Sequence, residues 1–102
     1  MQYRQGDVLI EAIKTIPDSA KPERPKGQRV VLAEGELTGH AHTLPASSVM
    51  ALAVPEGDLF IRVRRASLLM HQEHGKIEIP AGEYRVTRQR EYSPEEIRRV
   101  TD

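Results

Sequence analysis

The sequence contains no cysteine and no tryptophan, and its only aromatic residues are Tyr3, Phe60, Tyr84 and Tyr92. Without cysteine the chain has no disulfide framework, no thiolate nucleophile and no cysteine-type zinc site. Histidine and carboxylate side chains are therefore the only strong metal ligands available. Because aromatic residues are scarce, Val, Ile, Leu and Ala must build the core, and few rings are present on which nucleic-acid bases can stack.

The chain also lacks net charge and long hydrophobic runs. Its 15 lysine and arginine residues balance its 15 aspartate and glutamate residues, so no overall field attracts nucleic acid or an anionic membrane. Apolar runs such as residues 49–54 are far shorter than the roughly 20 residues that span a bilayer, and Arg4 and Asp7 interrupt the stretch where a signal peptide is apolar. We therefore expect a cytoplasmic protein without a membrane segment. A length of 102 residues predicts a single domain, 1–102.

Alternation of apolar and polar residues dominates the segments between the glycines and prolines. Leu59, Ile61 and Val63, for example, alternate with larger or charged residues, as in a strand with one buried side. Seven segments show strand character: 7–13, 29–33, 49–54, 59–64, 67–70, 76–79 and 84–87. About seven short strands at close spacing predict an all-β fold, either a small barrel or a sandwich.

Two segments depart from this pattern. Residues 16–27 contain three prolines and almost no apolar side chain after Ile16, which predicts a long mobile loop that serves as a lid or as an arm for a partner. Residues 93–96, Ser-Pro-Glu-Glu, form a capping box with proline at the first helical position. This box predicts a short C-terminal helix.

All histidines of the chain fall into two clusters, His40-Ala41-His42 and His71-Gln72-Glu73-His74. Residues i and i+2 of a strand point to the same face with Cα atoms about 6.5 to 7 Å apart, so His40 and His42 can direct their imidazoles at one metal ion. The second cluster lies between two predicted strands, where residues 72–75 are typical of a hairpin loop with Gly75 at a positive φ. His71 and His74 then flank a turn and can converge.

Both spacings suit chelation, so the two clusters together favour a metal site over polar turn histidines that bond to the backbone. The predicted ligands are four imidazoles, or three with one carboxylate: His40, His42, His71 and His74, with Glu73 or Glu36. Imidazole accepts several divalent ions, and the sequence does not choose among Zn, Fe, Mn, Ni and Cu.

Glu73 lies between the histidines of the second cluster and is the predicted catalytic residue. It is either a metal ligand or the general base that activates a water bound to the metal, and its alternative role is that of a solvated turn residue. A general base must lie within about 3 Å of the proton it removes, or one water further. A short turn beside two ligands places a carboxylate near that range.

Two stretches resemble the motifs of the cupin family. Gly39-His40-Ala41-His42 is similar to the HxH of the first cupin motif, and residues 75–82, Gly-Lys-Ile-Glu-Ile-Pro-Ala-Gly, are similar to the glycine, spacer and Pro-x-Gly run of the second. The resemblance extends over residues 35–86. It implies a small β-barrel in which the HxH, a nearby glutamate and a later histidine hold a divalent metal.

The sequence differs from the cupin pattern in three places. No glutamate follows His42 at the usual short interval, the spacer before Pro80 is one residue short, and Arg85 stands where the later histidine belongs. His71 and His74 would take the place of that later histidine. The strings of residues 35–42 and 89–92 also resemble small bacterial and phage-borne proteins, a resemblance that implies no particular activity.

Arginine is concentrated in the late strands. Arg62, Arg64 and Arg85 can form one outward patch that holds phosphate or a carboxylated partner. Glu78 and Glu83 lie in the same region, and such alternation of charge is usual for a solvated sheet surface. The neutral total charge and the few aromatic rings argue against a nucleic-acid interface.

The sequence leads to two functional hypotheses. The first is a metal-binding β-barrel enzyme, either a hydrolase or, with iron, an oxygenase. The second is a non-catalytic module with a structural metal, in which the arginine-rich face binds a protein or nucleic-acid partner or the proline-rich segment binds a larger partner. The partners considered are a larger protein or a further copy of the chain, with nucleic acid less favoured. Three protein ligands and an open coordination position indicate catalysis, whereas four protein ligands indicate a structural site.

Overall fold

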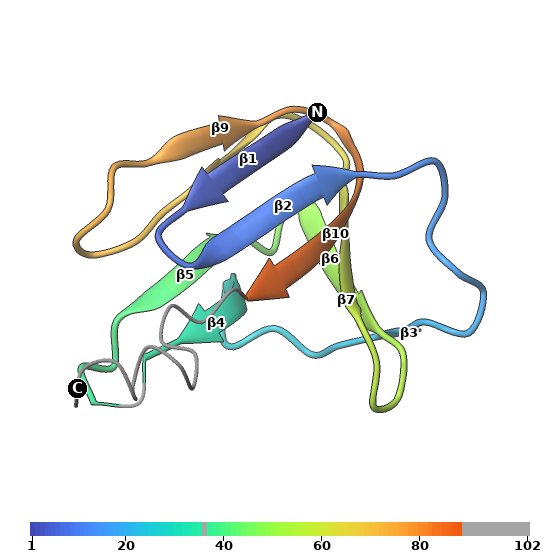
Figure 1. Cartoon of the computed structure of the whole chain (residues 1–102), viewed down its shortest axis with the longest axis horizontal. Coiled ribbons are helices and arrows are strands. Elements are labelled where there is room, and N and C mark those ends of the chain that lie inside the picture. Colours follow the sequence, from blue (N-terminus) through green and yellow to red (C-terminus); the bar gives the residue numbers. More distant parts are fainter. Residues whose placement is uncertain (36, 89–102) are drawn as a thin grey trace, which may run out of the picture.

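The computed structural model describes residues 1–35 and 37–88, and in these ranges the chain forms ten strands and no helix (Figure 1). The strands are β1 (Gln2–Gln5), β2 (Val8–Ala12), β3 (Lys21–Pro22), β4 (Arg29–Glu34), β5 (Ala41–Pro45), β6 (Val49–Ala53), β7 (Leu59–Val63), β8 (Ser67–Leu69), β9 (Ile77–Ile79) and β10 (Gly82–Arg88). The all-β prediction is confirmed, and the described residues include no helix that could cross a membrane. The predicted C-terminal helix and Glu36 lie outside the described residues.

The strands form two layers. The first layer is a six-stranded antiparallel sheet in the order β1-β2-β10-β7-β6-β3. In the second layer β4 pairs with β5 and β8 pairs with β9, and the backbones of Thr43 and Met70 join the two pairs through two hydrogen bonds of 2.9 Å. Because β4 contacts β6 and β9 lies beside β1, the second layer meets the first near both of its borders (Figure 1).

The core lies between these layers and is almost entirely aliphatic. Its most deeply buried side chains come from β2, β5, β7, β8 and β9: Val8, Ile10, Leu44, Ile61, Leu69 and Ile79. Each such side chain contributes about 1.5 to 3 kcal/mol when it leaves water. The predicted alternation of β7 is confirmed, since Phe60 faces away from this core and packs with Ile16 and Leu52 in a second, smaller cluster.

The prediction of about seven strands was too low, because β1, β3 and β5 lack the expected pattern. The residues of β1 are mostly polar, and this strand exists through its antiparallel pairing with β2. In β5 the two inward positions are His42 and Leu44, so one buried position carries a polar ring. A strand that buries a histidine does not show the apolar alternation by which strands are recognised.

Residues 16–27 do not form a single free loop. Ile16 is buried, Lys21 and Pro22 pair with β6, and the backbone N–H of Glu23 donates to the carbonyl of Ala51 at 2.8 Å. The prediction of a long loop was wrong at these points, because a short strand and a buried side chain lie within the segment. Backbone hydrogen bonds to β6 hold the segment, and such bonds require no apolar side chains.

Candidate metal centre

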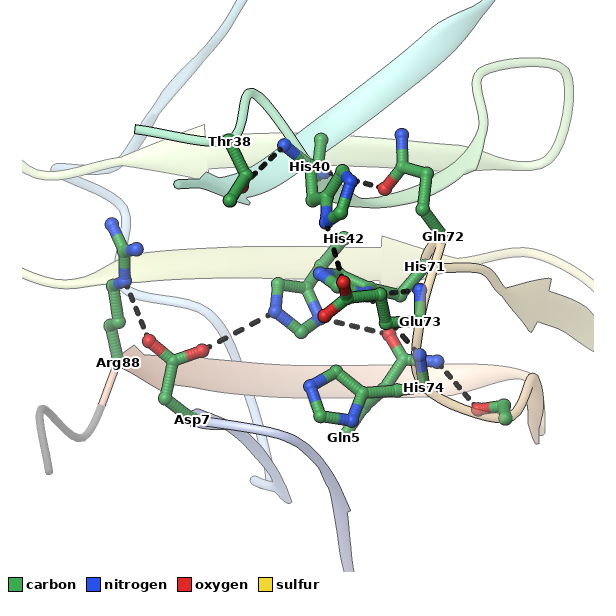
Figure 2. Close-up of polar contacts among 12 residues, drawn as sticks. Gln5, Asp7, Thr38, His40, His42, His71, Gln72, Glu73, His74 and Arg88 are labelled. Atoms are coloured by element: carbon green, nitrogen blue, oxygen red, sulfur yellow. Dashed lines mark hydrogen bonds and ion pairs between the residues drawn. The ribbon is translucent and has the colours of Figure 1, made fainter. Parts of the chain in front are cut away.

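The histidine rings of the two clusters lie together (Figure 2). The ring centres of His42 and His71 are 4.3 Å apart, and those of His71 and His74 are 4.6 Å apart. The ring of His40 lies 5.7 Å from His71, and that of His74 lies 5.9 Å from His42. These four rings line one cleft, which we call the histidine cleft. The structure therefore brings together all four histidines that the sequence singled out.

The join between β5 and β8 explains this convergence. Thr43 and Met70 exchange two backbone hydrogen bonds, so the preceding His42 and the following His71 lie next to each other. The backbone N–H of Ala41 also donates to Gln72 Oε1 at 2.8 Å, which holds the second cluster against the start of β5. The two clusters are thus connected by main-chain pairing rather than by the histidines alone.

Gln5 determines which nitrogen of His42 faces the cleft. The Gln5 amide is buried, and its Nε2 donates to the carbonyls of Leu69 at 3.0 Å and Gly75 at 2.8 Å. These two acceptors orient the amide, so its Oε1 faces His42 Nδ1 at 2.9 Å. Because an amide oxygen only accepts, Nδ1 must carry the proton. His42 Nε2 is therefore left with a lone pair.

Asp7 faces this lone pair from the turn between β1 and β2. Its Oδ1 lies 3.3 Å from His42 Nε2, and its Oδ2 accepts a hydrogen bond of 2.9 Å from Arg88 Nε. Burial acts to raise the pKa of Asp7, but the hydrogen bond and charge of Arg88 outweigh it and leave this pKa below its ordinary value. Asp7 is therefore an anion at neutral pH, directed at His42 (Figure 2).

Gly6 makes this arrangement possible in two ways. It precedes Asp7 in the two-residue turn of the β1–β2 hairpin and has a φ of 61°, a value typical of the first position in a type II′ turn. A Cβ atom at Gly6 would also lie 2.5 Å from His74 Nε2. The absence of a side chain therefore both permits the turn and leaves room for the His74 ring.

His71 has a structural task within its own loop. Its Nδ1 accepts the backbone N–H groups of Glu73 at 3.0 Å and His74 at 3.3 Å. An accepting Nδ1 places the proton of the neutral ring on Nε2. These two hydrogen bonds close the loop between β8 and β9. The predicted positive φ at Gly75 was wrong, because a loop of this length reverses the chain without it.

His40 and Glu73 lie at the rim. His40 directly precedes β5, and its Nδ1 is 3.5 Å from Glu73 Oε2. The backbone N–H of His40 donates to Thr38 Oγ1 at 3.1 Å. The Glu73 side chain is 67% exposed, so the predicted catalytic carboxylate is a rim residue that still reaches the cleft.

Two rings of the cleft, those of His42 and His71, have pKa values below the ordinary value of histidine. Burial, followed by the neighbouring His71 ring, lowers the pKa of His42 against the opposing effect of Asp7. Burial, followed by the His74 and His40 rings, lowers the pKa of His71 in the same direction. At neutral pH His42 and His71 are therefore neutral, which is the form of imidazole that binds metal.

The histidine cleft has a volume of about 220 Å³ and opens to solvent. Besides the histidines, its walls include Asp7, Thr38, Glu73 and Arg88. Within residues 1–35 and 37–88, no three His, Asp or Glu side chains stand in a geometry that would hold a metal ion as placed. A larger cleft of about 540 Å³ lies beside the proline-rich segment and β6, and it contains no histidine.

Sequence reasoning did not identify Gln5, Asp7 and Arg88 as site residues. A signal was present for Asp7, because Gly6-Asp7 between two short strands is typical of a hairpin turn. Gln5 and Arg88 carry no local signal, since their roles depend on partners in other strands.

The predicted outward patch of Arg62, Arg64 and Arg85, the arginine face, is largely paired with carboxylates. Arg62 Nε donates to Glu83 Oε2 at 2.9 Å, and Arg85 Nη2 donates to Glu11 Oε1 at 3.1 Å. These pairs match the solvated-surface alternative. Arg64 Nη2 donates to the carbonyl of Ser47 at 3.3 Å.

Comparisons with known proteins identify a family but no activity. Searches of curated proteins and of solved structures each return no match to this chain. The cupin resemblance stays a prediction. A family profile described as a domain of unknown function, DUF8820, matches residues 4–89, and the chain therefore belongs to this family.

Proposed function

We propose that the histidine cleft binds a divalent metal ion between His42 Nε2 and Asp7 Oδ1. The observation that carries this proposal is the distance of 3.3 Å between these two atoms, together with the orientation that Gln5 imposes on the ring. Two ligands of a tetrahedral ion, each at about 2.0 to 2.2 Å, are separated by roughly 3.4 Å. The separation is long for a hydrogen bond and fits such a ligand pair.

The contact between Gln5 and His42 supports the same assignment. Histidines that bind metal almost always donate their second ring N–H to an oxygen, which fixes the tautomer and the ring orientation. Gln5 Oε1 takes that role for His42 Nδ1. The lowered pKa of His42 also reduces the competition between protons and metal at neutral pH.

His74 is the third ligand in this proposal, which leaves one coordination position open, and His40 stays at the rim. Two imidazoles on one tetrahedral ion have ring centres about 5 Å apart. The distance of 5.9 Å between His42 and His74 is close to that value, so a modest side-chain movement completes the site. We assign His71 to loop capping, because binding through its Nε2 would move the proton to Nδ1 and break two hydrogen bonds.

The open cleft favours a catalytic site over a structural one. A structural site encloses its metal with four protein ligands, whereas the histidine cleft leaves a rim at Glu73 and His40 exposed to solvent. We therefore favour a metal-dependent hydrolase, with Glu73 as its general base, over an interaction module. Zn, Fe, Mn, Ni and Cu all remain compatible with imidazole and carboxylate ligands.

Metal analysis of the protein purified without an affinity tag tests the proposal. We expect close to one equivalent of a divalent metal per chain, or uptake of one equivalent of Zn²⁺ after treatment with a chelator. Bound metal should raise the melting temperature, because a ligand of the native state adds RT ln(1 + [L]/Kd) to stability. A chain that takes up no metal, and whose melting temperature a chelator leaves unchanged, would exclude the proposal.

A further inference from the structure

Arg88 has hydrogen-bonding capacity that its contact with Asp7 does not use. Among the described residues, its single hydrogen bond runs from Nε to Asp7 Oδ2 at 2.9 Å. Figure 2 shows both Nη groups on the side of the guanidinium away from Asp7. The side chain is 34% exposed and lines the same cleft as Thr38, His40 and His42. Among the described residues, the two Nη groups thus remain as adjacent donors of fixed geometry on a residue that lines the cleft.

Asp7 couples these donors to the proposed metal position. One carboxylate oxygen faces His42 Nε2 and the other accepts a hydrogen bond from Arg88 Nε, so Asp7 connects the guanidinium to the proposed metal position. The two carboxylates that line the cleft, Asp7 and Glu73, carry less charge than a divalent ion and a guanidinium together. The loaded cleft therefore carries excess positive charge and attracts an anion.

The number of contacts selects the kind of anion. A guanidinium binds two oxygens side by side, and a metal ion takes a third. A carboxylate has only two oxygens and cannot satisfy both groups fully, whereas a phosphate group can. The cleft volume of about 220 Å³ also suits a single small anionic group, such as a phosphate, rather than a large molecule.

We propose that the metal-loaded cleft binds the phosphate group of its substrate, with Arg88 as the residue that recognises it. This inference rests on the proposed metal site and names the substrate class of the same cleft, a phosphate ester. Arg88 acts as a binding residue, and its Nη groups are the donors to the phosphate oxygens.

Phenylphosphonate, a stable analogue of a phosphate ester, is the probe, and benzoate is the matched planar carboxylate. The metal-loaded protein is titrated with each by calorimetry, after Zn²⁺ binding has been measured separately. The variant is Arg88→Gln. The matched control is Arg85→Gln, which removes another β10 arginine that pairs with a single carboxylate, Glu11, outside the cleft.

We expect Arg88→Gln to weaken phenylphosphonate binding about 10- to 100-fold, as the loss of charge-assisted hydrogen bonds implies. Arg88→Gln also removes the hydrogen bond that holds Asp7, so its Zn²⁺ affinity is measured first and phenylphosphonate is titrated at saturating Zn²⁺. Arg85→Gln should match the parent in both titrations. Benzoate should bind at least about 10-fold more weakly than phenylphosphonate, because it lacks the third oxygen.

Each contrary result has a distinct meaning. If Zn²⁺ binds but phenylphosphonate does not, or if Arg88→Gln binds it as well as the parent, the phosphate inference fails and the metal proposal stands. If benzoate binds as tightly as phenylphosphonate, the phosphate inference also fails, and a carboxylate is the substrate group that the cleft accepts. If no protein in the series binds Zn²⁺, the metal proposal fails and this inference fails with it.

Discussion

The arginine face and the histidine cleft both gather polar side chains, but they do so by different means. Arg62 and Glu83 stand directly opposite each other in the register of β7 and β10, and Arg85 and Glu11 do so in the register of β10 and β2. Neighbouring strands of one sheet are sufficient to produce such pairs.

The contact between Gln5 and His42, by contrast, joins β1 of one layer to β5 of the other. It exists only when the two layers close upon each other. The difference indicates that pairing within a sheet produces a solvated surface, whereas contact between layers produces oriented groups with unused lone pairs.

The largest expected effect comes from His42→Ala. Loss of this ligand should weaken Zn²⁺ binding by about 10²-fold or more and remove the rise in melting temperature, because the variant lacks the one nitrogen directed at Asp7. Metal competition titration measures this change. His71→Asn is the sharpest control, since an asparagine oxygen can accept the same loop N–H groups while the ring is lost. Equal metal loss in both variants would make His71 a ligand.

Gln5→Leu should have the next largest effect. It removes the acceptor for His42 Nδ1 and should lower metal affinity about 10- to 100-fold. The carbonyls of Leu69 and Gly75 also lose their donor, which should cost about 1 to 3 kcal/mol of unfolding free energy. Urea unfolding and metal titration measure the two effects. Gln2→Leu changes an exposed glutamine of the same strand and should alter neither.

Mild acid should reduce the stability of the metal-free protein by a smaller amount. The pKa values of His42 and His71 are lowered in the folded state, so below about pH 6.5 the unfolded chain binds more protons and unfolding is favoured. The contribution of Asp7 has a separate window, because its lowered pKa is crossed only below its ordinary value of 3.8. Urea unfolding at pH 7.5, 6.5 and 5.5 tests this, and constant or rising stability would contradict it.

The smallest effect should come from Arg62→Gln on the arginine face. The Arg62 side chain is 46% exposed, and exposed ion pairs typically contribute at most about 1 kcal/mol. We expect unchanged metal affinity and a change in unfolding free energy below that value. A larger loss of unfolding free energy would show that ion pairs within the sheet contribute as much as contacts between the layers, and would contradict the distinction between the arginine face and the histidine cleft.

Much of the fold could be predicted from local pattern. The alternation in β7 correctly placed Ile61 and Val63 in the core and Phe60 on the opposite face. The hairpin of β8 and β9 was also predicted at its position. Strand β5 was expected only from the spacing of His40 and His42, and it begins after His40. Its apolar pattern gave no signal, because His42 occupies a buried position where apolar residues are expected.

The sequence by itself determined the all-β class, the absence of thiolate chemistry and the grouping of the histidines into two close pairs. Only the tertiary structure decided that the pairs meet, that Asp7 and Arg88 join them, and that His42 presents Nε2 while His71 caps its loop. The physical reason is that periodicity reports the two faces of a single strand, whereas the proton of an imidazole lies on whichever nitrogen its partner requires. For His42 that partner is Gln5, 37 residues away in the chain and on the opposite layer.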